Sequence, residues 1–280
     1  MLRIYQIWFW IGSRLWPRSA AKQAFDLFIT TQKRVSKPLP PIFLAADLLE
    51  WNESGDCCKG WRWNKGGKLR ILILHGFSSS ARNFAHLVET LTQHGAEVVA
   101  FDAPVHGSSE GKRIHSLRYS KFIQAIREKW GPFDEYKAHS FGGLSLSLAL
   151  EEKQPRSQER VVLIAPATET RSTLKQLQST LLLSDRLMGH INRIIEKRSG
   201  HPTSWFSVNR AISGLPNPIL WVHDRSDEVT PIEDTWPTQN RSAQTVFFRI
   251  TDGLGHRRVY RDPSVCEEVI QFLTTSYLPK

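Results

Sequence analysis

The feature that most constrains the fold of this chain is a serine that ends a short, poorly hydrated run and directly precedes a helical stretch. The run covers residues 135–139, the serine is Ser140, and helical character continues through residues 144–150. A strand, a sharp turn and a helix in direct succession hold a serine in a strained position, from which its hydroxyl projects. Only small residues fit two positions before and after it, and Ala138 and Gly142 stand there. Because such a pentapeptide is common by chance, the rest of the chain must decide its meaning.

Apolar runs of strand length recur along the chain and alternate with helical segments. They cover residues 69–74, 97–101, 161–165, 219–222 and 245–250, and a closing helix is expected at 263–276. Near-continuous apolar runs are typical of strands buried on both faces of a parallel sheet. The alternation therefore predicts an α/β fold with a doubly wound, mostly parallel sheet. Residues 51–68 are polar and Gly-rich, and we expect one short strand with turns there.

The alternation of strands and helices fails in one long stretch before residue 216. Residues 168–213 carry helical patches at 174–187 and 191–197 and no buried strand. Because a structureless loop of that length is uncommon in a compact domain, we expect a helical cap over the strand ends. The sequence thus predicts an N-terminal helical extension at 1–42 and a domain at 43–280 with the cap insertion at about 168–213.

The first residues allow two interpretations. The apolar stretch 4–11 is too short to span a bilayer as a helix. Helical spacing relates Ile4, Ile7, Trp8, Ile11 and Leu15, and the interpretation that we favour is a helix that packs onto its own domain. Alternatively, residues 1–18 form a peripheral membrane anchor at the inner face of the membrane. A second helical piece at 20–29 precedes a proline-rich extended crossing at 33–41.

Composition limits the classes of partner and compartment. The chain has 280 residues, a net charge of +10 and three cysteines. The basic residues are dispersed and accompany no zinc-ligand spacing or RNA-binding signature, so we expect a solvated basic surface and no nucleic-acid partner. The odd cysteine count without a CxxC spacing indicates neither a disulfide framework nor a metal site, and a reducing, cytoplasmic compartment is expected. With no nucleotide fingerprint either, no cofactor is implied.

Five separate pieces of the chain, in order, resemble the motifs of the α/β-hydrolase family. The resemblance extends over residues 70–278 and looks most like a bacterial subgroup whose substrates are largely unassigned. The Ser, Asp, His order is the one that this fold imposes. The loop at 102–109 departs from the usual D-x-P-G-H-G-x-S because Val105 replaces a glycine. The pieces are His75-Gly76, Asp102–Ser109, Ala138-His139-Ser140-Phe141-Gly142, His223–Pro231 and Gly253-Leu254-Gly255-His256.

Chemistry and the resemblance together give each candidate residue a role. Ser140 is the expected nucleophile, because serine needs a base to take its proton and His256 lies in a Gly-flanked loop that can reach it. Asp227 would orient His256; Asp224 is a rival, although the spacing to Pro231 favours Asp227. We expect the oxyanion donors to be the backbone N–H groups of Phe77 and Phe141. Substrate contacts are expected from His75, Gly76, Trp205 and Phe206. Supporting hydrogen bonds are expected from His75, His106 and His139, and a carboxylate that structures its loop is expected at Asp102.

These roles predict a serine hydrolase that cleaves a carboxylic ester or thioester of a small molecule through an acyl-enzyme. Peptidase, acyltransferase and lyase chemistry stay open, because the fold does not fix the reaction. A peripheral membrane lipid hydrolase and a non-catalytic pocket-binding protein are the alternatives. The presence of all three triad members counts against the last of these.

Overall fold

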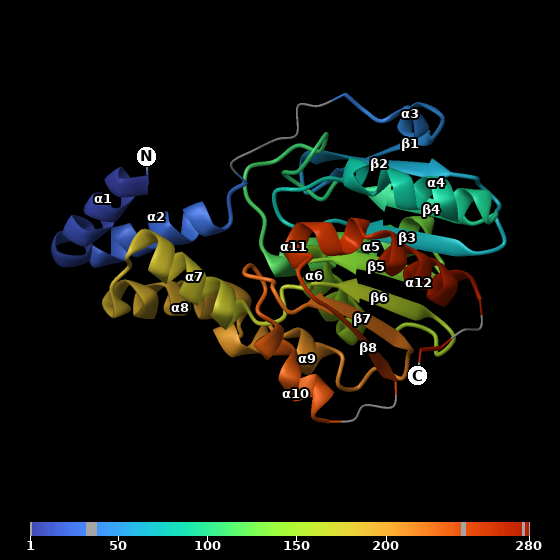
Figure 1. The fold of residues 1–280 in the computed structure, drawn as a ribbon. Helices are drawn as coiled ribbons and strands as arrows, with labels where there is room; N and C mark the ends of the chain where they lie inside the picture. Colours follow the sequence, from blue (N-terminus) through green and yellow to red (C-terminus); the bar gives the residue numbers. More distant parts are fainter. Residues whose placement is uncertain (1, 32–37, 242–244, 276–277, 280) are drawn as a thin grey trace.

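The computed structural model describes residues 2–31, 38–241, 245–275 and 278–279. Most of the expected extended crossing, at 32–37, and the end of the closing helix at Ser276 lie outside these residues. One eight-stranded sheet forms the centre of the molecule, in the order β1-β2-β4-β3-β5-β6-β7-β8 (Figure 1). Strands β3 to β8 run parallel, whereas β2 pairs antiparallel with both β1 and β4. The strands are β1 Asp47–Glu53, β2 Asp56–Trp63, β3 Arg70–Leu74, β4 Glu97–Phe101, β5 Glu135–His139, β6 Arg160–Ile164, β7 Ile219–Asp224 and β8 Val246–Thr251.

The predicted doubly wound, mostly parallel sheet is confirmed, but the expectation of one short strand before it is wrong. Residues 47–63 form a hairpin of two strands, joined by Ser54 and Gly55, both at positive φ. A two-residue turn of this kind matches the twist of the strands it joins. The first strand was missed because it lies at the edge of the sheet, where half-exposed polar residues resemble a loop.

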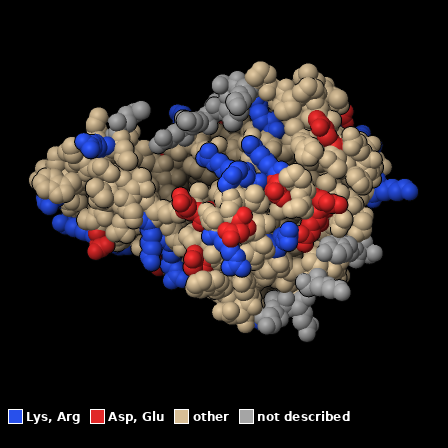
Figure 2. Space-filling view, viewed as in Figure 1, with Lys and Arg blue, Asp and Glu red and all other residues tan. Residues whose placement is uncertain are grey.

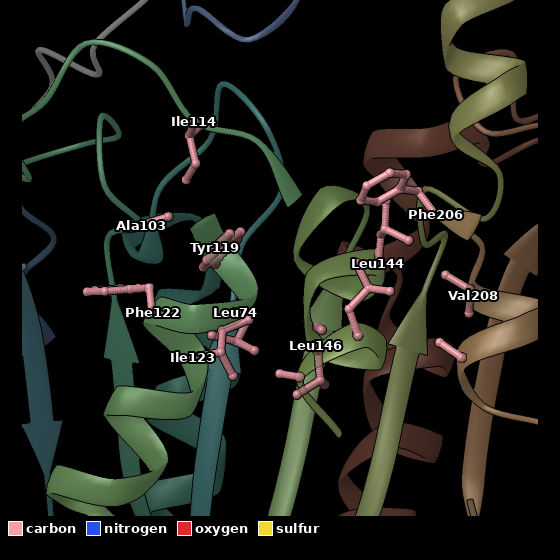
Figure 3. Packing of buried hydrophobic residues seen from close by; sticks show 14 of the residues in the cluster. Leu74, Ala103, Ile114, Tyr119, Phe122, Ile123, Leu144, Leu146, Phe206 and Val208 are labelled. Carbon is pink, nitrogen blue, oxygen red and sulfur yellow. The ribbon is translucent and has the colours of Figure 1, made fainter. Parts of the chain in front are cut away.

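Helices cover both faces of the sheet (Figure 1). The side chains of strand β3 alternate between two separate cores, one on each face of the sheet. Leu72 and Leu74 pack with α5 and α6 on one face, as Figure 3 shows for Leu74, whereas Ile71 and Ile73 pack with α4 and α12 on the other. The helices are α1 Leu2–Leu15, α2 Pro17–Phe28, α3 Pro41–Leu44, α4 Ala85–Gln93, α5 Ser116–Trp130, α6 Phe141–Glu152, α7 Thr170–Leu181, α8 Asp185–Ser199, α9 Val208–Ala211, α10 Trp236–Gln239, α11 Gly255–Arg258 and α12 Pro263–Thr274.

Four helices, α1, α2, α7 and α8, gather into a lobe beside the sheet, at the left of Figure 1. Helices α7 and α8 break at residues 182–184, inside the helical patch expected at 174–187, because Leu182 is left-handed and the Ser184 hydroxyl caps α8. Helix α2 packs on α8 through its small residues, and Gly12 of α1 lies directly against Ala20. The lobe therefore joins residues that are far apart in the sequence.

Helix α1 turns most of its predicted apolar stripe away from the protein. Phe9 and Gly12 are buried toward α2, whereas Ile4, Ile7, Ile11 and Leu15 are exposed. The expectation that this helix packs onto its own chain is therefore met through Phe9, Gly12 and the half-buried Trp8, whereas the other members of the predicted stripe stay exposed. Among the described helices, none has the length and apolar character required to cross a bilayer.

Candidate active site

Ser140 occupies the tight connection between β5 and α6. Its backbone has φ 54° and ψ −122°, a strained conformation for a residue with a side chain. A Cβ at Gly142 would lie 2.6 Å from the carbonyl oxygen of His75, and one at Gly76 would lie 2.8 Å from the Cβ of Ser140. The small residues thus let the start of α6 and the loop after β3 approach the serine closely, as the sequence pattern predicted.

A chain of hydrogen bonds joins Ser140 to two residues from distant loops. His256, in α11 after β8, has its Nε2 3.0 Å from the Ser140 Oγ and its Nδ1 2.8 Å from Oδ2 of Asp227, which follows β7. Because a carboxylate only accepts hydrogen bonds, Nδ1 of His256 carries the hydrogen and Nε2 is free to accept the serine proton. This is the arrangement in which a histidine can act as a base toward a serine hydroxyl.

Asp227 is held in its ionised form. Burial by itself would raise the pKa of Asp227, but the hydrogen bond and charge of His256, together with bonds from Thr230, outweigh it and lower the pKa. Its Oδ1 accepts the backbone N–H groups of Val229 and Thr230, each at 2.8 Å, and its Oδ2 accepts the Thr230 hydroxyl at 2.8 Å. The negative charge is therefore fixed beside the ring that would become positive during proton transfer.

Asp224, the alternative candidate for the triad acid, has a structural role instead. Its Oδ1 accepts the N–H groups of Ser226 and Gly255, and its Oδ2 accepts the N–H of Leu254 and the hydroxyl of Thr251. Burial alone would raise the pKa of Asp224, but these four donors lower it. Asp224 thus ties the loop that carries His256 to the end of β7, and its described hydrogen bonds do not include the His256 ring.

Two buried histidines connect the loop after β3 to the loop after β4. His75 Nε2 accepts the N–H of Ala103 at 2.9 Å, and His106 Nε2 accepts the N–H of Ser78 at 3.0 Å. Burial lowers the pKa of His75 to about 4. Burial and, second, the nearby His75 lower the pKa of His106 to about 3. Both rings therefore stay neutral near pH 7, which they must do in order to accept these bonds. They fix the backbone on either side of Phe77, one of the two expected oxyanion donors.

Asp102 and His139 add further bonds in the same region. The Asp102 carboxylate accepts the N–H of Ala81 at 2.8 Å and of Ser108 at 2.7 Å, and thereby spans two loops. His139 Nε2 lies 3.1 Å from the carbonyl oxygen of His256 and can donate to it. Phe141 is the first residue of α6, where backbone N–H groups have no acceptor within the helix and the dipole is positive. This is the polarity that a developing oxyanion requires.

Val105 stands where the resembled loop has glycine, and its backbone shows why glycine is usual there. Its φ is 77°, a left-handed conformation that a β-branched residue rarely adopts. The side chain is buried in the core on the α5 and α6 face, and the N–H donates to the carbonyl of Glu110 at 2.7 Å. Apolar burial and this hydrogen bond offset the strain, so the loop keeps its shape without the glycine.

A cavity of about 900 Å³ lies between the sheet and the lobe; its lining includes His256 and Phe141, next to Ser140, although Ser140 itself is not among the described lining residues. Phe77, Phe141 and Leu144 line it near Ser140, and Phe25 and Phe28 of α2 line its far wall. Phe206 is also a lining residue, as expected, but Trp205, His75 and Gly76 are not. The His75 ring points beneath the loop instead, and Trp205 stacks on His201. Figure 2 shows the hollow between lobe and body.

The contribution of α2 to the cavity could not have been found from the sequence, because it depends on α2 docking on α8. The cavity wall is largely apolar, and its charged lining residues are Arg198, Arg257 and Arg261. No aspartate or glutamate stands among the described lining residues. Likewise, no group of His, Cys, Asp or Glu in the described ranges could hold a metal ion.

Comparison with known proteins agrees with this geometry. Residues 67–213, just over half of the chain, match the family model described as serine aminopeptidase, S33. A Mycoplasma pneumoniae protein named putative esterase/lipase 2 is 23% identical over 228 residues, which cover 70% of this chain and 85% of that protein. Mouse monoglyceride lipase is 26% identical over 157 residues, 51% of this chain and 52% of that protein. A Pyrococcus furiosus esterase has the same fold, with a TM-score of 0.63 at 19% identity over 88% of this chain and 97% of its own.

The fold and the hydrogen-bonded serine define a hydrolase of the α/β class. The chain belongs to the serine aminopeptidase S33 family of α/β hydrolases. The predicted family, fold and enzyme class are therefore confirmed.

Proposed function

We propose that this chain is a serine hydrolase of carboxylic esters that works through an acyl-enzyme on Ser140. The observation that carries the proposal is the hydrogen-bonded chain from Ser140 through His256 to Asp227. Esterases and lipases among the relatives and structural neighbours support the ester as substrate class.

In the first half of the reaction, His256 Nε2 removes the hydroxyl proton of Ser140 as the oxygen attacks the ester carbonyl. Asp227 stabilises the imidazolium that forms. The N–H groups of Phe77 and Phe141 donate to the oxyanion of the tetrahedral intermediate. The intermediate collapses, the C–O bond to the alcohol breaks, and His256 gives its proton to the departing oxygen.

In the second half, water attacks the acyl-enzyme. His256 takes one proton from the water, the tetrahedral intermediate forms again, and Ser140 leaves as its oxygen recovers that proton. The products are a carboxylic acid and the free enzyme. A thioester would follow the same steps with a thiol as leaving group.

The lining of the cavity favours an ester with an apolar acyl group over a peptide with a free amino terminus. A site for an ammonium group needs a negative partner, and the described lining residues include three arginines and no carboxylate. We also propose that residues 168–213 act as a cap and residues 1–42 as an extension that completes the cavity wall. The partner is a small-molecule ester and not a nucleic acid; the three free cysteines are consistent with a cytoplasmic location.

Labelling with a fluorophosphonate probe tests this function. The natural protein should be labelled, and Ser140→Ala should lose labelling and more than about 99% of ester hydrolysis while it keeps its circular dichroism spectrum. Ser145→Ala, which removes another buried serine of α6, is the matched control and should keep both. Unchanged turnover in Ser140→Ala would overturn the proposal.

A further inference from the structure

Helix α1 is apolar on two sides, and only one of them is covered. Phe9, on the covered side, is 1% exposed, whereas Ile4, Ile7 and Leu15 on the other side are 69%, 61% and 65% exposed. Ile11 lies on the same uncovered side and is 38% exposed. A helix that is apolar all round is normally buried, and contiguous exposed apolar surface marks an interaction site. We refer to Ile4, Ile7, Ile11 and Leu15 as the α1 stripe.

The charged residues of the segment that carries the α1 stripe are all basic. Residues 2–25 include four basic residues and no aspartate or glutamate: the basic ones are Arg3, Arg14, Arg18 and Lys22. Arg14 lies over the ring of Trp10, with 3.8 Å from its guanidinium carbon to the ring centroid, and both side chains are exposed. Burial and then the charges of Arg193, Arg18 and Arg186 lower the pKa of His190 on α8, so Arg18 adds to the positive charge around that ring. Figure 2 shows basic side chains along the edges of the lobe, with acidic ones also at its lower edge.

From these observations we propose that the α1 stripe docks into the surface of a lipid bilayer rich in anionic head groups. A 14-residue helix is about 21 Å long, shorter than the hydrocarbon core of about 30 Å, so it lies in the plane of the interface. The stripe enters the acyl boundary, and the arginines contact the head groups. Exposed Trp10 and Trp16 have the apolar body and polar N–H that suit this depth.

A second copy of the chain is a poorer occupant of the same surface. A symmetric contact presents the same patch on both subunits, so the arginines that flank the α1 stripe would face basic residues of the partner. Within residues 2–25 no carboxylate could compensate that repulsion. Anionic lipid head groups supply the complementary charge that another copy lacks.

Docking would place the cavity near its substrate. Helix α2 follows α1 directly, and its Phe25 and Phe28 line the cavity above Ser140. The helix that rests on the bilayer is thus continuous with the helix that forms the far wall. This part of the inference rests on the proposed function, whereas membrane binding itself does not.

Vesicle co-sedimentation tests the docking. The natural protein should bind vesicles of phosphatidylcholine with about 30% phosphatidylglycerol at least about tenfold more tightly than pure phosphatidylcholine vesicles, and salt at about 0.5 M should weaken that binding. The variant Ile4→Gln/Ile7→Gln/Ile11→Gln/Leu15→Gln should bind about 100-fold more weakly. Its circular dichroism spectrum should not change, because all four side chains are exposed.

Two controls separate the outcomes. Leu44→Gln removes another highly exposed leucine, on α3, and should bind vesicles like the natural protein. Hydrolysis of a soluble short-chain ester should be the same in the quadruple variant, so a failure of docking and a failure of the proposed function can be told apart. Equal vesicle binding by the natural protein and the quadruple variant would overturn the inference. It would also be overturned if the natural protein and Leu44→Gln were dimers in solution and the quadruple variant were a monomer.

Discussion

Replacing Asp227 by asparagine should remove activity and leave the fold almost untouched. The oxygen of the amide can keep both backbone N–H bonds, and its NH₂ then stands where Oδ2 was, facing the Thr230 hydroxyl and Nδ1 of His256. The hydroxyl can accept from it, but Nδ1 can accept only if the ring hydrogen moves to Nε2. That hydrogen then points at Ser140, and His256 can no longer take the serine proton.

The expected loss in kcat/KM for Asp227→Asn is about 10⁴-fold, as for the same change in another serine hydrolase, or roughly 5.5 kcal/mol of transition-state stabilisation. Every polar group of the new amide keeps a partner, so the free energy of unfolding should fall by only about 1 kcal/mol.

Asp224→Asn is the matched control, and its effect should be on stability. Three of the four donors to Asp224 are backbone N–H groups, which cannot accept a hydrogen bond from an amide. At least one of them must lose its partner, at a cost of about 3 kcal/mol. For a chain of this size that is a fall of roughly 6–12 °C in Tm.

Measurement of kcat/KM on p-nitrophenyl butyrate, together with Tm from circular dichroism, separates the two variants. If Asp227→Asn kept activity within about tenfold of the natural protein while Asp224→Asn lost activity at unchanged Tm, the assignment of the two carboxylates would have to be reversed.

The remaining predictions concern the loops that frame the serine. In the folded protein the pKa of His106 is lowered to about 3. The neutral ring therefore contributes fully to the free energy of unfolding above the unfolded pKa of about 6.5, and that contribution is lost as the pH falls below this value. Between about pH 7 and pH 5 the free energy of unfolding should therefore fall about 2 kcal/mol further in the natural protein than in His106→Gln; equal falls in urea denaturation would refute the neutral buried ring. Gly142→Ala should cost about 3 kcal/mol in the same assay, because its Cβ meets the His75 carbonyl at 2.6 Å. Gly189→Ala on α8, where the nearest heavy atom is 3.8 Å away, should instead stabilise by about 0.5–1 kcal/mol.

The sequence predicted those parts of the molecule that depend on local patterns. The buried strands are nearly continuous apolar runs, and Ser140, Asp227 and His256 each follow a strand whose carboxyl end lies at the same edge of the sheet. Their meeting therefore follows from the topology of a parallel sheet. The first strand of the hairpin, at 47–53, was missed because an edge strand buries only part of one face, which weakens the period-two signal.

The far wall of the cavity was not predictable, because Phe25 and Phe28 reach it only through the packing of α2 on α8. The orientation of α1 has the same cause. Its sequence is apolar on two sides, and only the position of α2 decides that Phe9 is covered and Ile7 is not.

The lobe built from α1, α2, α7 and α8 has a consequence for biosynthesis. Helix α2 leaves the ribosome roughly 160 residues before α8, which at ordinary elongation rates of about 5–20 residues per second is a delay of about 10–30 s. During that interval Ala20, Ala24 and Phe25 have no partner from α8, and the nascent chain carries two apolar helices ahead of an unfinished sheet. A chaperone or a lipid surface that shields these helices during translation would raise the yield of folded protein, whereas the completed molecule would need such protection only for α1.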